Sequence, residues 1–154
     1  MNRKDAPAEA GRPERRQTVK QETGKKESRK EYRSSEDYLE AILLVRNRDK
    51  RCRSIDVARQ LGFSKPSVSN AVAKLEAEGL VERGEDGDLL LTENGERIAQ
   101  HTLEKHEFFA SLFERLGVDR KTAQDDACAL EHNISDESYQ ALSGFILRIL
   151  PPNS

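Results

Sequence analysis

Two short amphipathic segments separated by three residues constrain the fold more than any other feature of this 154-residue sequence. The first, SIDVARQL, has Ser54 as its expected N-cap and Gly62 as its stop. The second follows Ser64, a favourable N-cap, has Pro66 in its first turn and continues with apolar residues at helical spacing. Two helices joined by so tight a turn predict a helix-turn-helix, the geometry that places a helix in the major groove of DNA.

Flanking segments extend this pair of helices into a winged helix-turn-helix. A helix rich in apolar residues is predicted before the pair, from Ser34 or Ser35 through Val45. After the pair, Val81 and residues 89–91 have strand character, and the dipeptide Asp86-Gly87 between them is typical of a hairpin turn. Three-helix units with a hairpin also occur in protein-interaction modules, so this topology is compatible with more than DNA binding.

The remaining sequence is predicted to be helical, which makes the whole chain mainly α. A long amphipathic helix follows Thr92 and reaches Leu116, a second covers about 120–132, and a last one runs from Ser135 to Leu150. We therefore expect a winged helix-turn-helix DNA-binding domain followed by a helical domain. The expected divisions are an arm, a DNA-binding domain, a helical domain and a tail, at residues 1–33, 34–92, 93–150 and 151–154.

Charge is unevenly distributed along the chain. Residues 1–33 contain 11 Lys and Arg and 6 Asp and Glu, a net charge of +5, whereas the whole chain has a net charge of -2. This segment is predicted to be a disordered basic arm, either a solubilising tail or an arm attracted to phosphates. The sequence has no secretory signal, no apolar run near the roughly 20 residues of a membrane span, and no disulfide framework. We therefore expect a cytoplasmic protein without membrane association.

The second helix of the pair carries the chemistry expected of a DNA-reading surface. Its predicted exposed face has short polar or basic groups and no acid before Glu76, whereas an ordinary solvated face usually has acids near its start. Such groups can approach base edges and phosphates. We therefore predict DNA contacts, with the two lysines on phosphates, from Lys65, Ser67, Ser69, Asn70 and Lys74.

The segment DDACALEHNIS brings together three side chains that can bind a metal. Cys128, Glu131 and His132 have the spacing i, i+3, i+4, so in a helix they share one face. Each has an ordinary alternative explanation: a small buried hydrophobic residue for the cysteine, a solvated glutamate and an idle histidine. Spacing alone leaves both interpretations open.

Three further candidates come from two other predicted helices. Asp37 and Glu40 extend an apolar stripe of the first helix, and His106 lies within the stripe of the long helix. Taken singly, the two acids suit the helix dipole and the histidine suits a satisfied core position. Taken together with the segment above, converging carboxylates repel unless a cation lies among them. A mixed set of O, N and S donors suits Mn²⁺ or Fe²⁺ rather than structural zinc.

Five segments carry a family resemblance, in the order SSEDYLEAILLV, DVARQLGFSKPSVSNAVAKLEAEGLV, LTENGERIAQ, HEFFASLFERLGVD and DDACALEHNISDES. Over roughly residues 34–147 the chain resembles the metal-dependent repressors of the DtxR/MntR type (diphtheria toxin repressor and manganese transport regulator). The resemblance implies a winged helix-turn-helix and a helical metal-binding and dimerisation domain. It further implies a homodimer that binds a palindromic operator in double-stranded DNA when activated by a divalent metal, usually repressing metal uptake.

The resemblance also implies roles for individual positions. Aspartate at position 37 is similar to the manganese-sensing branch and cysteine at position 128 to the iron-sensing branch, so Mn²⁺ and Fe²⁺ both remain candidates. An ancillary site of iron-type members has Ala110 and Gln124 at two of its positions here, and we expect it to be absent or altered. The SH3-like third domain of longer members is expected to be missing. The family's metal ligands correspond to Asp37, Glu40, His106, Cys128, Glu131 and His132.

The family's DNA contacts correspond to Ser64, Pro66, Ser67 and Asn70. The predicted wing departs from the pattern, because acids at positions 85, 86 and 88 would make its tip repel phosphates, so we expect no wing contact. The leading hypothesis is a metal-responsive transcriptional repressor, and the alternative is a metal-independent winged-helix regulator. An enzyme is not expected, because the sequence lacks an HExxH motif, a Gly-rich phosphate loop and a nucleophile-base-acid set. A metal-storage protein is not expected either, because storage would not require the second helix of the pair with its predicted DNA-reading face.

Overall fold

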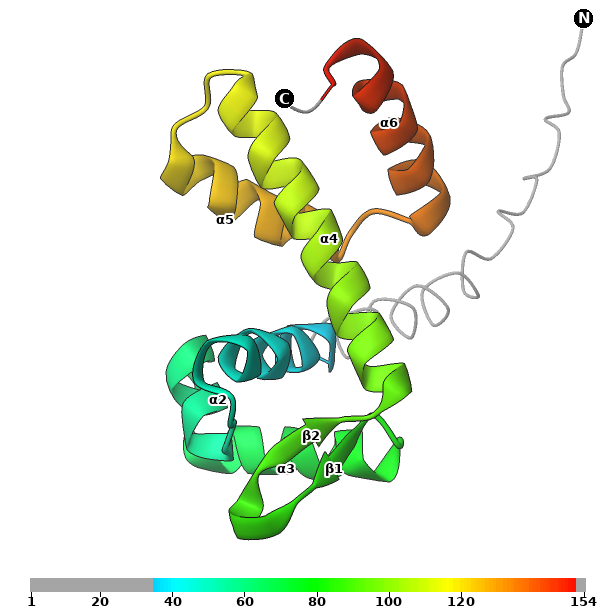
Figure 1. Ribbon diagram of the computed structural model, residues 1–154. Coiled ribbons are helices and arrows are strands. Elements are labelled where there is room, and N and C mark those ends of the chain that lie inside the picture. The colour runs from blue at the N-terminus through cyan, green and yellow to red at the C-terminus, as the bar shows by residue number, and fades with distance from the viewer. Residues whose placement is uncertain (1–34, 152–154) are drawn as a thin grey trace, which may run out of the picture. The chain divides into compact units, whose positions relative to one another are not determined.

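The computed structural model describes residues 35–151. The expected basic arm and the last three residues of the expected tail lie outside the described residues. Within them, the first helix covers residues 35–49 and is followed by α2 (Ser54–Leu61) and α3 (Lys65–Ala77). Figure 1 shows α2 and α3 next to each other, as the predicted helix-turn-helix requires.

The turn between α2 and α3 follows the predicted pattern at its end but not at its start. Gly62 terminates α2 in the left-handed conformation, with φ of 69°, and the Ser64 hydroxyl caps α3. The expectation that Ser54 caps α2 is wrong, since Arg53 occupies the N-cap position. The Arg53 N–H donates to the Asp56 carboxylate at 2.9 Å. Asp56, the third residue of the helix, thus satisfies the N–H of the N-cap residue, which is the reciprocal half of a capping box.

The wing is a two-stranded antiparallel hairpin. Strand β1 (Val81–Arg83) pairs with β2 (Leu89–Leu91), with Val81 opposite Leu91. Asp86 and Gly87 both have positive φ, 56° and 74°, as the central residues of a tight hairpin turn require. The predicted position of the turn is therefore confirmed.

The long helix α4 (Glu93–Arg115) begins where the hairpin ends. The Thr92 hydroxyl accepts from the Gly95 N–H at 3.2 Å and donates to the Gly79 carbonyl at 2.7 Å. A Cβ at Gly95 would collide with the Leu80 carbonyl oxygen, so only glycine permits this close approach. The start of α4 is therefore held against the segment that leads into the wing.

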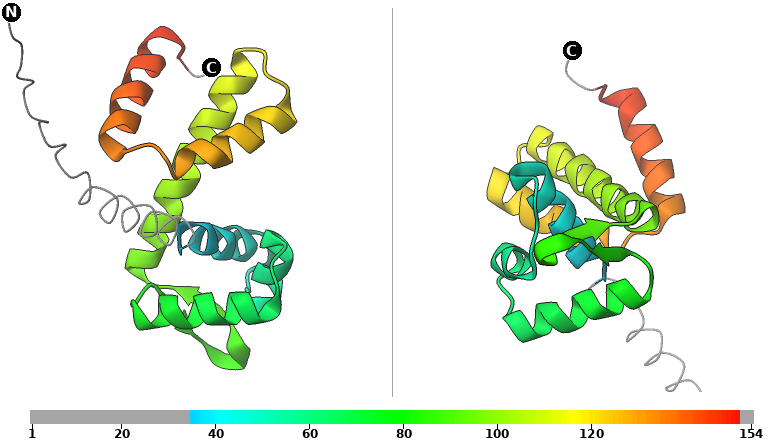
Figure 2. Two further views of the ribbon diagram at one scale, coloured as in Figure 1. Left: turned by 180° about the vertical axis from the view of Figure 1, so that it is seen from behind. Right: turned by 60° about the horizontal axis from the view of Figure 1, so that its bottom comes forward.

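Two further helices complete the chain. α5 (Arg120–Glu131) and α6 (Asp136–Ile149) lie on opposite sides of α4, as Figure 1 and Figure 2 both show. Their limits agree with the predicted ones to within a residue or so, and the mainly α architecture with a winged helix-turn-helix is confirmed. No helix in the described part of the chain combines the length and the apolar character needed to cross a membrane.

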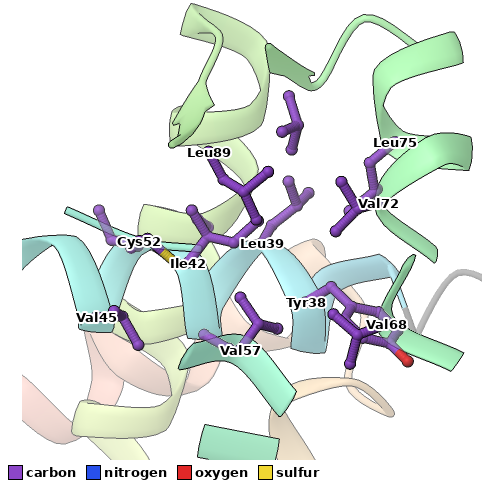
Figure 3. Close-up of a cluster of buried hydrophobic side chains, with 14 of the residues drawn as sticks. Tyr38, Leu39, Ile42, Val45, Cys52, Val57, Val68, Val72, Leu75 and Leu89 are labelled. Atoms are coloured by element: carbon purple, nitrogen blue, oxygen red, sulfur yellow. The ribbon is translucent and has the colours of Figure 1, made fainter. Parts of the chain in front are cut away.

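The main hydrophobic core surrounds the first helix (Figure 3). Leu39, Ile42 and Val45 are fully buried and lie among side chains of α2, α3 and β2. Burying a side chain of this size stabilises the fold by about 1.5–3 kcal/mol. The partners that the close-up shows around these three residues are Tyr38, Cys52, Val57, Val68, Val72, Leu75 and Leu89.

Candidate metal centre and nucleic-acid interface

Six side chains predicted as metal ligands meet where the first helix, α4 and the end of α5 come together. Two groups of possible donors, each with its atoms within 4.8 Å of one another, share the Glu131 carboxylate. Asp37 joins them because its Oδ1 lies 2.6 Å from His132 Nε2. The two groups are Cys128, Glu131 and His132, and Glu40, His106 and Glu131.

Glu131 is the centre of this cluster. Its side chain is fully buried, with Oε2 2.7 Å from His106 Nδ1 and Oε1 3.0 Å from His132 Nε2. It occupies the last position of α5, and His132 is the C-cap of that helix. A carboxylate is disfavoured at the negative end of a helix dipole and disfavoured again by burial. Helix stability therefore does not explain a glutamate at this position.

Each imidazole also has an outer partner that the sequence did not predict. Glu36 Oε2 lies 2.7 Å from His132 Nδ1, and Gln124 Oε1 lies 2.7 Å from His106 Nε2. Glu36 could have been suspected only as the neighbour of Asp37. Gln124 was singled out only as a position where a second metal ligand is missing.

Burial and charge shift the protonation of the cluster strongly. Burial, reinforced by Glu131, raises the pKa of Glu40 to about 7. The hydrogen bond with Glu131 raises the pKa of His106 to about 9, against the effect of burial. Burial alone would lower the pKa of His132, but the nearby carboxylates of Asp37, Glu131 and Glu36 raise it to about 11. Without a metal ion, protons on the two imidazoles supply the positive charge in this cluster.

Two buried atoms at the centre have no hydrogen bond within the described residues. These are Glu131 Oε1 and His132 Nε2, which lie within ion-pair distance of charged neighbours but not in directions that form hydrogen bonds. Native proteins leave few buried polar atoms in this state, and an ion at the site is one established reason. Carboxylate, imidazole and thiol donors together fit a divalent cation such as Mn²⁺ or Fe²⁺.

Cys128 lies at the exposed edge of the cluster. The interpretation of this residue as a small buried hydrophobic side chain is wrong, because it is exposed on α5 while its neighbour Ala127 faces α4. Partial desolvation of the thiol, followed by the charges of Glu131 and Asp37, raises its pKa. The thiolate form is consequently disfavoured until positive charge is added nearby.

The predicted DNA-contacting residues share one exposed surface at the start and along the outer face of α3. Ser64 and Ser67 hydroxyls lie 2.9 Å apart, and Lys74 Nζ lies 3.9 Å from Glu78 Oε1. The opposite face of α3 is buried in the core, which directs the polar face outward. The exposed residues are Ser64, Lys65, Pro66, Ser67, Ser69, Asn70 and Lys74.

The wing tip is less acidic than the sequence suggested. Asp88 is not at the tip: its carboxylate is only 16% exposed and accepts from the Cys52 N–H at 2.8 Å. Both of its oxygens lie 3.0 Å from Arg46 Nη1. The acids left near the tip are Glu85 and Asp86, and Asp86 lies 3.6 Å from Arg51.

Comparison with protein families gives two adjacent matches. Residues 32–89 match the family described as iron dependent repressor, N-terminal DNA binding domain. Residues 92–149 match the iron dependent repressor, metal binding and dimerisation domain. Together the two matches include α3 and every residue of the cluster around Glu131.

Individual relatives agree with this assignment. The chain is 33% identical over 110 residues to the transcriptional regulator MntR of Escherichia coli O157:H7, covering 71% of each. It is 36% identical over 115 residues to an uncharacterized HTH-type transcriptional regulator of Methanocaldococcus jannaschii, covering 73% of this chain and 92% of that one.

Two solved structures share the fold. The manganese regulator SloR has a TM-score of 0.64 at 31% identity, and the IdeR protein of T. acidophilum has a TM-score of 0.64 at 28% identity. The matches cover 73% and 74% of this chain. The chain spans about half the length of both proteins, 53% in each case.

Proposed function

The chain belongs to the iron-dependent repressor family, and on this premise we propose that it represses genes of metal uptake when Mn²⁺ or Fe²⁺ binds around Glu131. Members of this family are metal-dependent transcriptional regulators with a DNA-binding domain and a metal-binding, dimerising domain; they are not enzymes. The single observation that carries the proposal is the buried pair Glu131 Oε1 and His132 Nε2, left without hydrogen bonds at the centre of a donor cluster.

The ligands of the proposed site come from both halves of the chain. Two are carried by the first helix, which forms the core of the winged helix-turn-helix, and four by α4 and α5. A bound divalent cation would supply the positive charge that the carboxylates of this cluster lack. The proposed ligands are Asp37, Glu40, His106, Cys128, Glu131 and His132.

This division of ligands explains how metal occupancy can control DNA binding. One ion bound by ligands from both halves would hold α3, the helix proposed to read the DNA, in a defined position relative to the dimerising half. Two such helices in a homodimer must be spaced to match about one turn of DNA, roughly 34–36 Å. A shift from about 1% to about 99% of molecules in the DNA-binding arrangement requires the metal to bind that arrangement more tightly than the alternative by about 5.5 kcal/mol. A site with several charged ligands can supply this.

We further propose a palindromic operator in double-stranded DNA, read by the exposed face of α3, and a homodimer. Dimerisation is supported by α6, which has no buried residue and exposes large apolar side chains. Leu142, Phe145 and Ile149 share one face of α6 at the spacing i, i+3, i+7, and an exposed apolar face of this kind typically marks an interface. The exposed apolar residues of α6 are Leu142, Phe145, Leu147 and Ile149. A DNA-bound regulator of this kind would act in the cytoplasm and have no catalytic function.

The test is a titration of the metal-stripped protein with Mn²⁺, anaerobic Fe²⁺, Co²⁺ and Zn²⁺, with affinity for its own promoter DNA recorded at fixed salt. We expect DNA affinity to rise by two orders of magnitude or more as each subunit fills. The ion effective at the lowest free concentration identifies the metal that is sensed. Glu131→Ala should bind DNA weakly with or without metal. Equal and tight DNA binding without metal would instead establish the metal-independent regulator.

A further inference from the structure

We propose that Glu36 and Gln124 are positioning residues that determine which ring nitrogen of His132 and of His106 faces the metal. The inference deepens the proposed function and rests on it only for the location of the metal. Both residues touch an imidazole at the nitrogen opposite the one that faces Glu131. Neither is among the six ligands.

Glu36 acts on His132 from the first turn of the first helix. Its Oε2 lies 2.7 Å from Nδ1, the His132 side chain is completely buried, and the Glu36 side chain is only 14% exposed. A carboxylate oxygen can only accept, so His132 must carry its proton on Nδ1. The lone pair of the neutral ring is then on Nε2, the atom that lies 3.0 Å from Glu131 Oε1 and has no hydrogen bond.

Gln124 acts on His106 from α5 with the opposite ring orientation. Its Oε1 lies 2.7 Å from Nε2, while Nδ1 lies 2.7 Å from Glu131 Oε2. When the amide oxygen accepts from the Nε2–H, the lone pair of the neutral ring is on Nδ1. The two inner nitrogens, His132 Nε2 and His106 Nδ1, thus face the two oxygens of one carboxylate.

The two outer partners differ in charge, which predicts an asymmetry. A carboxylate makes the histidine that donates to it a stronger ligand than a neutral amide does, and loss of such a partner typically costs 10–100-fold in metal affinity. Removing Glu36 should therefore weaken binding more than removing Gln124. A first-turn glutamate that only complemented the helix dipole would stabilise the helix without any effect on the His132 ring.

The test compares variants that remove the acceptor with variants that keep it. Glu36→Met and Gln124→Met preserve the approximate length of the side chain but cannot accept a hydrogen bond. Glu36→Gln and Gln124→Glu retain an acceptor oxygen. Glu104→Gln is the charge control, since Glu104 is an exposed glutamate that borders the same cavity as Glu36 and His132. Thermal unfolding in chelator establishes that each variant is folded.

Two measurements are made on each variant. Competition with a chelator gives the affinity for Mn²⁺, and long-range ¹H–¹⁵N spectra of the Zn²⁺-loaded protein identify the protonated nitrogen of each ring. We expect the methionine variants to lose about 10–100-fold in affinity and to lose the single protonation pattern of the ring concerned. The acceptor-retaining variants should preserve both ring patterns, and each should lose less affinity than the methionine variant at the same position. Glu104→Gln should stay within about threefold of the wild type.

Other outcomes separate this inference from the proposed function. Methionine variants that bind Mn²⁺ as the wild type does, with unchanged ring spectra, would overturn the positioning roles. If the ring patterns and affinities follow the expectation while DNA binding of the wild type ignores metal, the positioning roles stand and the proposed regulation fails.

Discussion

A cluster of charged residues lies near each end of the first helix, and only in the C-terminal cluster does every charged group have a partner that keeps its charge. At its C-terminal end, Arg46 meets Asp88 at the root of the wing, and its Nη1 also donates to the Leu89 carbonyl at 3.0 Å. The Cys52 N–H completes the set of donors to Asp88 at 2.8 Å, and this N–H, followed by Arg46, lowers the pKa of the carboxyl. A permanent cation and a backbone donor therefore satisfy this acid without a titrating partner or a metal ion.

At the N-terminal end, four carboxylates face two imidazoles. His106 and His132 carry positive charge only while protonated, and two buried atoms lack hydrogen bonds. The carboxylates are those of Glu36, Asp37, Glu40 and Glu131. One helix thus combines a structural ion pair with a cluster whose charge balance depends on protons or on a metal ion. Variants at the two ends should consequently differ in whether metal alters their effect.

The largest expected effect is that of Glu131→Gln. This change keeps the volume of the side chain but removes the charge shared by His106 and His132. We expect Mn²⁺ affinity to fall by more than about 100-fold, at least 2.7 kcal/mol, since a central ligand should matter more than an outer partner. Chelator competition measures the affinity, and binding to operator DNA should no longer respond to metal.

Glu107→Gln on α4 is a suitable control, because Glu107 is exposed and borders a cavity that includes Glu131. It should bind Mn²⁺ within about threefold of the wild type. A Glu131→Gln protein with undiminished Mn²⁺ affinity would show that the metal binds elsewhere, and the contrast between the two ends of the helix would lose its functional meaning.

Most of the fold could be predicted from the sequence because its signals are local. Gly62, Thr92 and Ser135 mark helix ends by the chemistry of one residue, and Asp86-Gly87 marks the hairpin turn through its left-handed conformations. Ser54 was wrongly predicted as an N-cap, because the helix begins one residue earlier than that prediction requires: Arg53 is the N-cap, and its N–H donates to the Asp56 carboxylate. Such competition between adjacent residues is not visible in a pattern.

The candidate site could be predicted less completely, because its contacts are distant in sequence. The six ligand types were identifiable, but their convergence was expected only from a family resemblance, and their binding of metal remains a prediction. Glu36 was missed because a first-turn glutamate already has an explanation, and its histidine lies 96 residues away. Asp88 was assigned to the wing tip because acids near a turn are usually solvated, whereas here Arg46 lies 42 residues earlier.

Asp88→Ala should produce the second-largest effect, and metal should not change it. The substitution leaves the Cys52 N–H and the Arg46 guanidinium without their acceptor in a partly buried position. We expect a loss of about 2–3 kcal/mol in the free energy of unfolding, measured by urea denaturation. The same loss should appear in chelator and in saturating Mn²⁺. A loss that disappeared on adding metal would mean that the two ends of the helix are energetically coupled.

A third expected difference is in pH dependence. The pKa of His106 is raised from 6.5 to about 9, so its charged form stabilises the metal-free fold fully below pH 6.5 and loses this contribution as pH rises through 9. His132, whose pKa is raised from 6.5 to about 11, adds a loss of the same sign from pH 6.5 upward, and Glu40, whose pKa is raised from 4.5 to about 7, adds a loss up to neutrality. We expect the free energy of unfolding in chelator to fall by on the order of 1–2 kcal/mol between pH 6.5 and 9.

Urea denaturation in chelator across this pH range measures the effect, and His106→Gln should make the curve less steep while His132 keeps part of the slope. The Arg46–Asp88 end should contribute equally throughout, because the lowered pKa of Asp88 places its titration in acid. Stability that stayed constant or rose toward pH 9 would contradict the protonation assigned to the imidazoles.

The smallest expected effect concerns the other acid of the wing. Asp86 lies two residues before Asp88, but its pair with Arg51 is exposed, with side-chain exposures of 74% and 55%. Asparagine adopts the positive φ of this position readily, so Asp86→Asn should change the free energy of unfolding by less than about 0.5 kcal/mol.

The same variant tests whether the wing contacts DNA. Because the acidic tip is expected to stay away from phosphates, the affinity of Asp86→Asn for operator DNA in Mn²⁺ should differ from that of the wild type by less than about twofold at 0.15 M salt, where charges are screened beyond about 8 Å. An affinity gain of tenfold, with a steeper salt dependence, would place the tip on the DNA backbone instead. Asp86 would then repel the DNA phosphates, whereas Asp88, two residues away, would still bind Arg46 and the Cys52 N–H and make no contact with DNA.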